Sequence, residues 1–315
     1  MFHASEEESE AGGHSTAAIK ATLNWLRSSL LKNSEAAHIV VWDGRAQWRY
    51  DLYPTYKSNR TDTELKRKER AEFNWQLPWL KQILSHMPLL QIEHPGAEAD
   101  DVAWGLSQSL LRSGHYVEVR TDDSDWQQMV CARLFWQGLR KGAKRKGLDD
   151  FKALPPLQAI CEVKALAGDT ADTLEGVPLI ADARATTLIQ QFGSLEQLLA
   201  AARDPFAFQE QPKWAKALAL PQVQELVLRN REMVTLSRGP SLSAADCLVS
   251  GNSFDEIELL GLFEQLEFWQ WFDGFESNFR RYERPMPNAE RQAIARCLAE
   301  WAPAWEHPSR DKRTV

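Results

Sequence analysis

Residues that form disulfides or bind soft metals are scarce in this sequence. Only four of the 315 residues are cysteines, they lie far apart, and no two of them make a CxxC pair. The seven histidines are scattered and show no metal-ligand spacing. These absences argue against a disulfide scaffold and a zinc site, and they favour free thiols in a reducing cytoplasm.

Long hydrophobic runs are absent as well. No apolar stretch approaches the roughly 20 residues that are needed to span a bilayer. The amino terminus is acidic, with four glutamates between residues 6 and 10, which is not the composition of a signal peptide. We therefore expect a cytoplasmic protein that has no membrane partner.

Positive charge is also in short supply, because 37 Lys and Arg face 44 Asp and Glu and give a formal net charge of −7. Eight of the acidic residues are the candidate metal ligands described below, and removing their eight negative charges from −7 leaves +1. Bound divalent cations would add further positive charge. The acidic composition therefore does not exclude a polyanionic substrate.

Hydrophobic periodicity predicts an α/β part followed by a helical part. Strand-like apolar runs at 38–42, 88–92 and 116–120 alternate with helical patterns at 16–32 and from about residue 97. Such alternation is typical of an α/β fold with a mostly parallel sheet flanked by helices. After residue 150 the pattern is mainly helical.

Further helices are expected on either side of this boundary. A charge-dense helix precedes a second helix at 73–86, in which Pro78 should produce a kink or mark the true start. A capping box at Ser194 opens another helix, and apolar spacing predicts one more at 255–271. Residues 303–315 have the composition of a frayed tail.

Acidic residues gather where the predicted strands end. Glu98–Asp101 follows the strand at 88–92, Asp122–Asp125 follows the strand at 116–120, and Asp43 ends the strand at 38–42. Strand ends along one edge of an α/β sheet are where such folds build their sites. Crowded carboxylates without His or Cys ligands favour Mg²⁺ or Mn²⁺ over zinc.

A third acidic group, Asp169 with Asp172, follows a further apolar stretch. Together the three groups are suited to two ions about 4 Å apart, which would clamp the attacking and leaving oxygens of a phosphodiester. Taken singly, each group is more simply explained as a solvated loop or a helix cap. The basic residues between 57 and 70 are likewise explained by a solvated helix face when taken alone.

These segments belong to motifs that share one order along the chain. They are Val41-Trp42-Asp43, Tyr56-Lys57-x-x-Arg60, Gly96-x-Glu98-Ala99-Asp100-Asp101-Val102, Thr121-x-Asp123-x-Asp125, Lys164-Ala165-Leu166-x-Gly168-Asp169-x-x-Asp172 and Gly176-Val177-Pro178. In that order they resemble the 5′-nuclease family, which includes the 5′-nuclease domain of bacterial DNA polymerase I, phage 5′–3′ exonucleases and flap endonucleases. The similarity extends from near residue 1 to about residue 275.

The resemblance implies a nuclease that cleaves DNA, and often RNA, near a 5′ end with two Mg²⁺ or Mn²⁺ ions. Its expected substrates are DNA with a 5′ end or flap and an RNA primer, in replication and repair, and we expect a monomer. The implied metal ligands are Asp43, Glu98, Asp100 and Asp101 for one ion, and Asp123, Asp125, Asp169 and Asp172 for the other. The implied phosphate-stabilising residues are Lys57 and Arg60, and the implied DNA-binding residues are Tyr56, Lys66, Arg67, Gly176 and Arg184.

The resemblance also implies a domain organisation. Residues 1–160 would form a PIN-like α/β nuclease core, 161–240 a helix–three-turn–helix DNA-binding region, and 241–315 a C-terminal helical segment with the tail. The sequence starts at Met1-Phe2-His3-Ala4, which is similar to the segment just after the family's first strand and its metal-ligand Asp. The alternative function is therefore a catalytically impaired DNA-binding relative that lacks this first Asp.

A second departure concerns the glycine-rich turn through which the family binds duplex backbone with a potassium ion. Leu179 and Ala181 stand where glycines are usual, and Ala183 stands where a lysine is usual. Side chains at these positions hinder close approach of the backbone to a phosphate. These substitutions argue against a K⁺ site, although Arg184 offers a replacement for the lost charge.

Overall fold

A computed structural model of the chain describes residues 10–32, 36–61, 63–204, 206–207, 211–238, 246–251 and 254–269. Contacts group these residues into two compact units, which are described separately. The first unit holds the described residues within 10–44, 60–95 and 246–269, and the second holds those within 45–59 and 96–238. The tail predicted at 303–315 and the last two residues of the helix predicted at 255–271 lie outside the described residues.

A three-stranded sheet forms part of the first unit. β3 (Ile39–Trp42) runs parallel to β4 (Leu90–Glu93), and β8 (Leu248–Gly251) pairs antiparallel with the other edge of β4. A two-residue hairpin of β1 (Glu10–Ala11) and β2 (His14–Ser15) lies near the start of the described chain. The strands predicted at 38–42 and 88–92 are confirmed, whereas β8 was not predicted because its four residues show no clear alternation.

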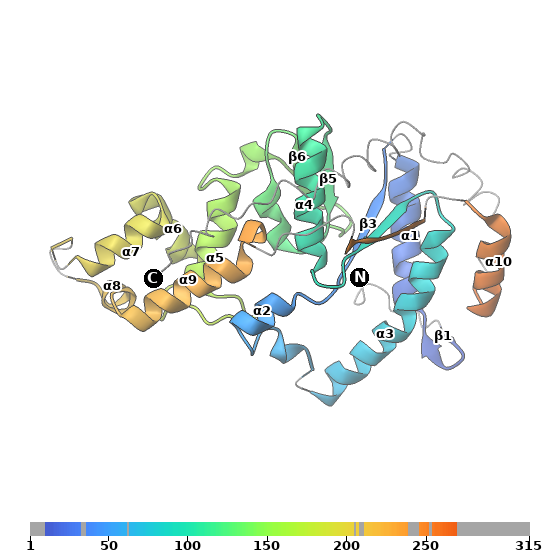
Figure 1. Cartoon of the computed structure of the whole chain (residues 1–315), viewed down its shortest axis with the longest axis horizontal. Helices are drawn as coiled ribbons and strands as arrows, with labels where there is room; N and C mark the ends of the chain where they lie inside the picture. The colour runs from blue at the N-terminus through green and yellow to red at the C-terminus, as the bar shows by residue number, and fades with distance from the viewer. Residues whose placement is uncertain are drawn as a thin grey trace. The chain divides into compact units, whose positions relative to one another are not determined.

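The core of the first unit is built by α1 (Ala17–Lys32), α3 (Glu64–Ser85) and α10 (Glu256–Gln265) (Figure 1). Apolar side chains recur at helical spacing on each of these helices, so that one face of each can be buried. Together they form one buried cluster. Its members include Ile19, Leu23, Leu26, Leu80, Ile83, Leu84, Leu259, Leu262 and Phe263.

α3 corrects the prediction of two successive helices. It runs without interruption over Glu64–Ser85, and Pro78 lies in its interior. An interior proline removes one backbone hydrogen bond and costs about 3 kcal/mol. Burial of Leu80, Ile83 and Leu84 compensates, because each such side chain contributes about 1.5–3 kcal/mol when it leaves water. Tertiary packing therefore outweighs the local preference.

The second unit also contains a three-stranded sheet. β5 (Val117–Arg120) is parallel to β6 (Leu134–Gln137), which pairs antiparallel with the short β7 (Arg145–Lys146). α4 (Ala99–Arg112) precedes β5, and the 3₁₀ helix η2 (Ser124–Met129) follows it. β5 confirms the strand predicted at 116–120, and α4 confirms the helix predicted from about residue 97.

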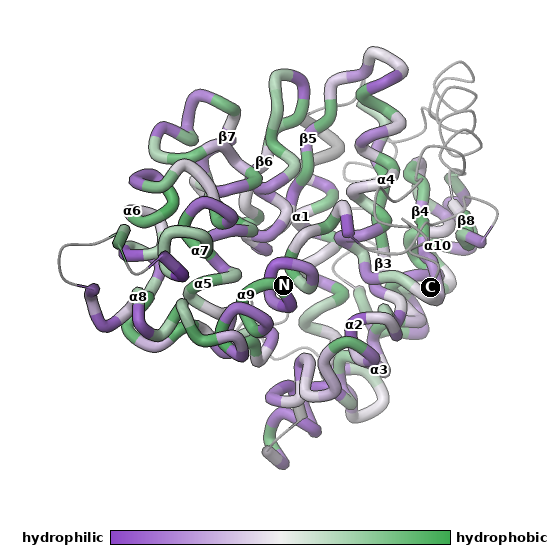
Figure 2. The backbone as a smooth tube through the Cα atoms, turned by 60° about the vertical axis from the view of Figure 1, so that its left-hand side comes forward, coloured by the Kyte–Doolittle hydropathy of each residue, from purple (hydrophilic) through white to green (hydrophobic). Residues whose placement is uncertain are grey.

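The rest of the second unit is helical. Figure 2 shows hydrophobic and hydrophilic residues mixed along these helices, and their apolar sides form a common core. Ser194 accepts a hydrogen bond from the N–H of Gln197, which confirms the predicted helix start. The elements are α2 (Gln47–Leu52), η1 (Ser58–Thr61, which ends in the first unit), η3 (Leu148–Asp150), the π-helix η4 (Gln158–Glu162), α5 (Val163–Ala167), α6 (Asp182–Phe192), α7 (Leu195–Arg203), α8 (Lys213–Leu218), α9 (Pro221–Val234) and η5 (Leu236–Arg238).

The predicted α/β class is confirmed, with sheets flanked by helices followed by a helical region. Each three-stranded sheet combines one parallel and one antiparallel pairing. The predicted domain boundaries after residues 160 and 240 stay predictions. Among the described helices, none is both long and apolar enough to cross a membrane.

Candidate functional site

The first turn of α4 concentrates negative charge. Glu98 is the N-cap residue, and its backbone N–H donates to Oδ2 of Asp101 at 3.1 Å. Oδ1 of Asp100 accepts the N–H of Asp101 at 2.8 Å. A helix N-terminus favours carboxylates because its unpaired N–H groups and the helix dipole carry partial positive charge. The helix start thus explains how three acidic side chains are held within four residues.

A buried arginine on α2 compensates much of this charge. Arg49 is 2% exposed, and its Nη1 and Nη2 donate to Oδ2 and Oδ1 of Asp101, both at 2.7 Å. Nη1 also donates to Oε2 of Glu98 at 3.1 Å and lies 3.8 Å from Oδ1 of Asp100. We call these four residues the Arg49 cluster. The planar guanidinium can bind several carboxylates at once, which an ammonium cannot do with fixed geometry.

Burial and charge oppose each other in the Arg49 cluster. Burial alone would lower the pKa of Arg49, but Asp100 and Asp101 outweigh it and the pKa is raised. Burial would raise the pKa of Glu98, but Lys57 and Arg49 outweigh it and the pKa is lowered. Burial does dominate at Asp100, whose pKa is raised well above its usual range despite Arg49. Glu98 is therefore held ionised, while Asp100 resists ionisation.

Tyr56 and Lys57 connect this cluster to a second group of acids. The Tyr56 hydroxyl donates to Oε2 of Glu98 at 2.9 Å and lies 3.4 Å from Oδ2 of Asp172. Lys57 Nζ lies 2.7 Å from Oε1 of Glu98 and 4.0 Å from Oδ1 of Asp172. Lys57 has a φ of 55°, a left-handed conformation that costs a non-glycine residue about 1 kcal/mol. Such strain is typical of residues whose placement serves a site.

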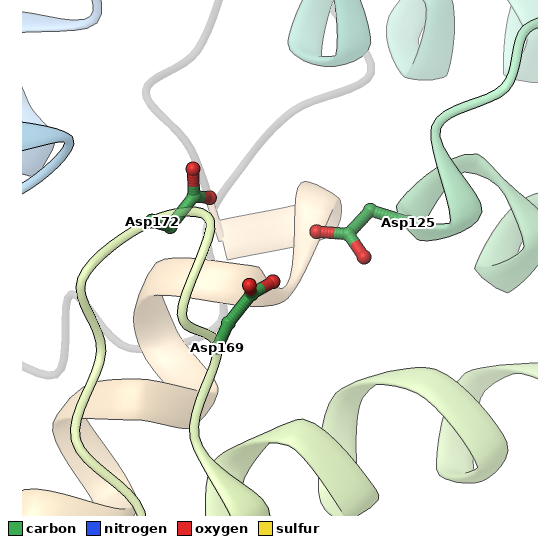
Figure 3. Close-up of side chains that lie close together, drawn as sticks. All are labelled: Asp125, Asp169 and Asp172. Atoms are coloured by element: carbon green, nitrogen blue, oxygen red, sulfur yellow. The ribbon is translucent and has the colours of Figure 1, made fainter. Parts of the chain in front are cut away.

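The second group is formed by Asp125 from η2 and by Asp169 and Asp172 from the loop after α5. One carboxylate oxygen of each lies within 4.8 Å of the others. In Figure 3 the carboxylates of Asp125 and Asp169 point toward each other, with Asp172 on the same loop as Asp169. Mg²⁺ binds oxygen at about 2.1 Å, so opposite ligands are about 4.2 Å apart. The three oxygens therefore fit one divalent ion after small movements.

Lys164 on α5 balances part of this negative charge. Its Nζ bonds Oδ1 of Asp125 and lies 2.6 Å from Oδ2 of Asp169. We call Lys164, Asp125, Asp169 and Asp172 the Lys164 cluster. Burial raises the pKa of Asp125 to about 6, although Lys164 opposes that shift. Burial would lower the pKa of Lys164, but the two aspartates outweigh it and the pKa is raised.

Two glycines hold the loop of Asp169 and Asp172 against α5. Gly168 ends α5 with a φ of 81°, which a glycine adopts without strain. A Cβ on Gly168 would lie 2.5 Å from the N of Gly176, and a Cβ on Gly176 would lie 2.0 Å from the O of Ala167. The two backbone segments are therefore in direct contact, and this contact fixes where the aspartates emerge.

Both parts of the chain match known families. Residues 1–149 match the 5′-3′ exonuclease, N-terminal resolvase-like domain, and residues 155–250 match the 5′-3′ exonuclease, C-terminal SAM fold. This chain belongs to the 5′-3′ exonuclease family.

The DNA polymerases among the curated relatives of this exonuclease-family chain are longer than it is. DNA polymerase I of Bacillus caldotenax is 25% identical over 88% of this chain and 31% of its own length. The thermostable DNA polymerase I of Thermus aquaticus is 26% identical over 96% of this chain and 35% of its own length. The 5′-3′ exonuclease of Buchnera aphidicola subsp. Baizongia pistaciae (strain Bp) is 31% identical over 58% of this chain and 59% of its length. The chain thus spans about a third of the polymerases that it matches.

Solved structures share the fold of this 5′-3′ exonuclease family member. The bacteriophage T5 D15 flap endonuclease aligns with a TM-score of 0.59 at 19% identity, over 79% of this chain and 90% of that protein. The catalytic core of Rad2 aligns with a TM-score of 0.52 at 14% identity, over 90% of this chain and 86% of that protein. At these identities the likeness concerns the fold.

The exonuclease motifs supply predicted metal ligands to both units. Within the second unit, the structure gathers Glu98, Asp100 and Asp101 in the Arg49 cluster and places Asp125, Asp169 and Asp172 in the Lys164 cluster. Asp123 is exposed and accepts the N–H of Asp125 at 2.9 Å, so it helps to shape the loop that carries Asp125. Asp43 is exposed and follows β3 in the first unit. The roles of all eight residues as ligands stay predictions.

The predicted DNA-contacting and phosphate-contacting residues lie in several places. Arg60 in η1 and both Lys66 and Arg67 on α3 are exposed in the first unit. In the second unit, Arg184 is exposed on α6 and its Nη1 donates to the O of Leu179 at 2.7 Å. Leu179 has a φ of 71°, the left-handed conformation expected of the glycine that it replaces. A glycine is required at position 176 because the backbone of Ala167 lies too close for a Cβ. The role of Gly176 in DNA binding stays a prediction.

Arg49 and the contacts of Lys164 were not anticipated from the sequence. Arg49 lies between Trp48 and Tyr50 in a short helix, and its acidic partners are 49 and 52 residues further on. Lys164 belongs to a recognised motif, but its spacing of five residues from Asp169 does not reveal that Nζ also reaches Asp125. One indirect indication of these cations was present in the sequence. Three neighbouring acids in a folded core require nearby positive charges, although the sequence does not say which residues provide them.

Proposed function

We propose that this member of the 5′-3′ exonuclease family is a metal-dependent nuclease that hydrolyses phosphodiester bonds at or near the 5′ end of DNA. The observation that carries the proposal is the convergence of Asp125, Asp169 and Asp172, whose oxygens lie within 4.8 Å of one another. The fold relatives support it, since the T5 D15 enzyme was solved with DNA and metal ions and Rad2 with a DNA substrate.

Mg²⁺ is the proposed ion and Mn²⁺ its substitute, because every candidate ligand is a hard carboxylate oxygen. The Lys164 cluster would hold one ion. For the second ion implied by the family resemblance, the second unit offers Glu98, Asp100 and Asp101 as ligands. When bound, such cations supply Lewis-acid stabilisation of the charge that develops on the phosphate.

The chain's own cations would complete the site. Lys57 Nζ lies between Glu98 and Asp172, at 2.7 and 4.0 Å, so it lies beside both carboxylate groups. A preorganised donor in this place can donate to a phosphate oxygen as negative charge builds up there. Tyr56 holds the Glu98 carboxylate and packs its ring 4.7 Å below Lys57 Nζ. Arg60 is also proposed to contact a phosphate of the substrate.

The substrate is proposed to be a duplex with a 5′ end or flap, or an RNA primer on DNA, bound by the protein as a monomer. Replication and repair are the processes that produce such ends. Exposed basic side chains at Lys66, Arg67 and Arg184 would contact phosphates, as electrostatic contacts supply most affinity for DNA backbone. A potassium ion at the turn around Leu179 is not part of the proposal.

Cleavage of a 5′-flap duplex in Mg²⁺ and in chelator tests the proposal. Asp172→Asn should lower the single-turnover rate by about 100-fold or more, because one ion ligand loses its charge. Asp149→Asn is the matched control, since Asp149 is an exposed aspartate on η3 of the same unit, and it should cleave at the parent rate. Undiminished cleavage in chelator would overturn the proposal.

A further inference from the structure

The Lys164 cluster already contains a cation, and that cation is part of the chain. We propose that the Lys164 ammonium is an exchangeable counter-ion: it stabilises the cluster without metal and has to leave Asp125 and Asp169 for a divalent ion to bind. The inference rests on the proposed function only in taking the cluster as the metal site.

The hydrogen bonds of Asp169 carry the first step. Its Oδ2 lies 2.6 Å from Lys164 Nζ, and its Oδ1 accepts the N–H of Ala171 at 2.9 Å. Both oxygens of Asp169 are therefore engaged, and Oδ1 of Asp125 is bonded to the same ammonium. An ion that takes Oδ1 of Asp125 and Oδ2 of Asp169 must compete with Lys164 for both oxygens.

Charge makes sharing unfavourable. A divalent ion and an ammonium on the same two oxygens would lie a few ångströms apart, in a site where burial already raises the pKa of Asp125. Like charges at that separation repel strongly wherever water screens poorly. The two cations therefore exclude each other. The apparent metal affinity equals the intrinsic affinity multiplied by the fraction of molecules in which Lys164 has left the site.

The build of Lys164 permits the exchange. Its side chain is 20% exposed, and a lysine has a flexible four-carbon stem that can rotate its charge into water. Arg49 offers the contrast within the same unit, since its side chain is 2% exposed and holds Asp101 through two parallel bonds. Of these two cations, Lys164 is the one whose charge can move into water, because its side chain is already partly exposed.

Calorimetric titration with Mn²⁺, without nucleic acid, tests the inference on the full chain. Lys164→Met keeps the length of the stem and removes the charge, and it should bind Mn²⁺ about tenfold more tightly or better. In chelator the Tm of Lys164→Met should fall below that of the parent, and saturating Mn²⁺ should restore it. Lys141→Met removes one exposed positive charge from the same unit and should change neither quantity.

A labelling experiment on the parent protein covers the case in which Lys164→Met does not fold. Reductive methylation followed by mass spectrometry should show severalfold more modification of Lys164 in Mg²⁺ than in chelator, with exposed Lys213 as internal reference. Unchanged or weaker Mn²⁺ binding by folded Lys164→Met would overturn the inference, as would equal labelling of Lys164 in both conditions. A chain that binds Mn²⁺ as expected but does not cleave DNA would overturn the proposed function alone.

Discussion

The Arg49 cluster and the Lys164 cluster hold the same number of carboxylates in different ways. Arg49 faces three acids with a buried, planar cation, and Lys57 adds a second positive charge beside Glu98. Lys164 faces its acids with a single, partly exposed ammonium. The Arg49 cluster is therefore nearly compensated by the chain itself, whereas the Lys164 cluster keeps an excess of negative charge.

The difference teaches that acidic residues alone do not define a metal site. What matters is whether their oxygens are committed to partners that cannot leave. Both oxygens of Asp101 are held by the Arg49 guanidinium, and this contact joins the start of α4 to α2. Asp172 lies 4.0 Å from Lys57 Nζ and 3.4 Å from the Tyr56 hydroxyl, both longer distances than those between Arg49 and Asp101.

Removing Arg49 should have the largest effect on stability. Arg49→Met leaves Asp101 buried without its guanidinium partner and Glu98 with Lys57 alone, and loss of one partner of a buried ion pair costs about 3–5 kcal/mol. Urea denaturation in chelator would measure this loss of unfolding free energy. The double variant Arg49→Met/Asp101→Asn should recover part of it. A variant as stable as the parent would show that the Arg49 cluster is compensated in another way.

Removing Lys57 should affect catalysis more than stability. Lys57→Met is expected to slow single-turnover cleavage of a 5′-flap duplex by about 100-fold, because a preorganised donor at the reacting phosphate is lost. Duplex affinity should change much less, and Lys57→Arg should recover part of the rate. A rate equal to that of the parent would show that Lys57 serves only to balance the charge of Glu98.

The pH dependence of stability should single out the Lys164 cluster. The pKa of Asp125 is raised to about 6 in the folded chain, so its protonated form favours folding. That stabilisation is complete below the ordinary aspartate pKa and is lost as pH rises through about 6.

In chelator, the parent should therefore lose about 2 kcal/mol of unfolding free energy relative to Asp125→Asn between about pH 4.5 and pH 7.5. Chemical denaturation at both pH values measures the difference. A parallel pH dependence of the two proteins would mean that Asp125 titrates normally.

An exposed ion pair should give the smallest effect and calibrate the others. Arg231 pairs with Glu196, whose side chain is 62% exposed. Arg231→Met should cost less than about 1 kcal/mol, since water screens such pairs and the free side chains gain entropy. The same urea titration that measures Arg49→Met provides this value. If Arg231→Met lost as much unfolding free energy as Arg49→Met, burial would not explain why the two ion pairs differ.

Local patterns predicted the elements that are specified locally. The cap at Ser194, the helix from about residue 97 and the strand ending before Asp43 follow from capping chemistry and periodicity. The strands β6 and β8 were not predicted, because neither has the alternation of β5 or the continuous apolar run of β3. Pro78 does not mark a helix start, because the packing of α3 against the core outweighs the local preference of proline.

The site was predictable to the extent that like residues recur at strand and helix ends. The sequence indicated that Asp125, Asp169 and Asp172 belong together, and the structure brings them together. Their cations were not predictable in the same way. Lys164 is 39 residues from Asp125, and Arg49 is 52 residues from Asp101. Contacts between residues so far apart in the sequence come from the fold, and residue spacing does not predict them.

The contact between Gly168 and Gly176 has a consequence for how quickly the site can respond to charge. No residue with a side chain fits at either position without moving backbone, so the loop that carries Asp169 and Asp172 has little freedom to rearrange. The cost of ordering such a loop is met during folding, so the loop does not have to reorganise during a reaction. The adaptable part of the site is then the Lys164 side chain, while the dipoles around it stay fixed.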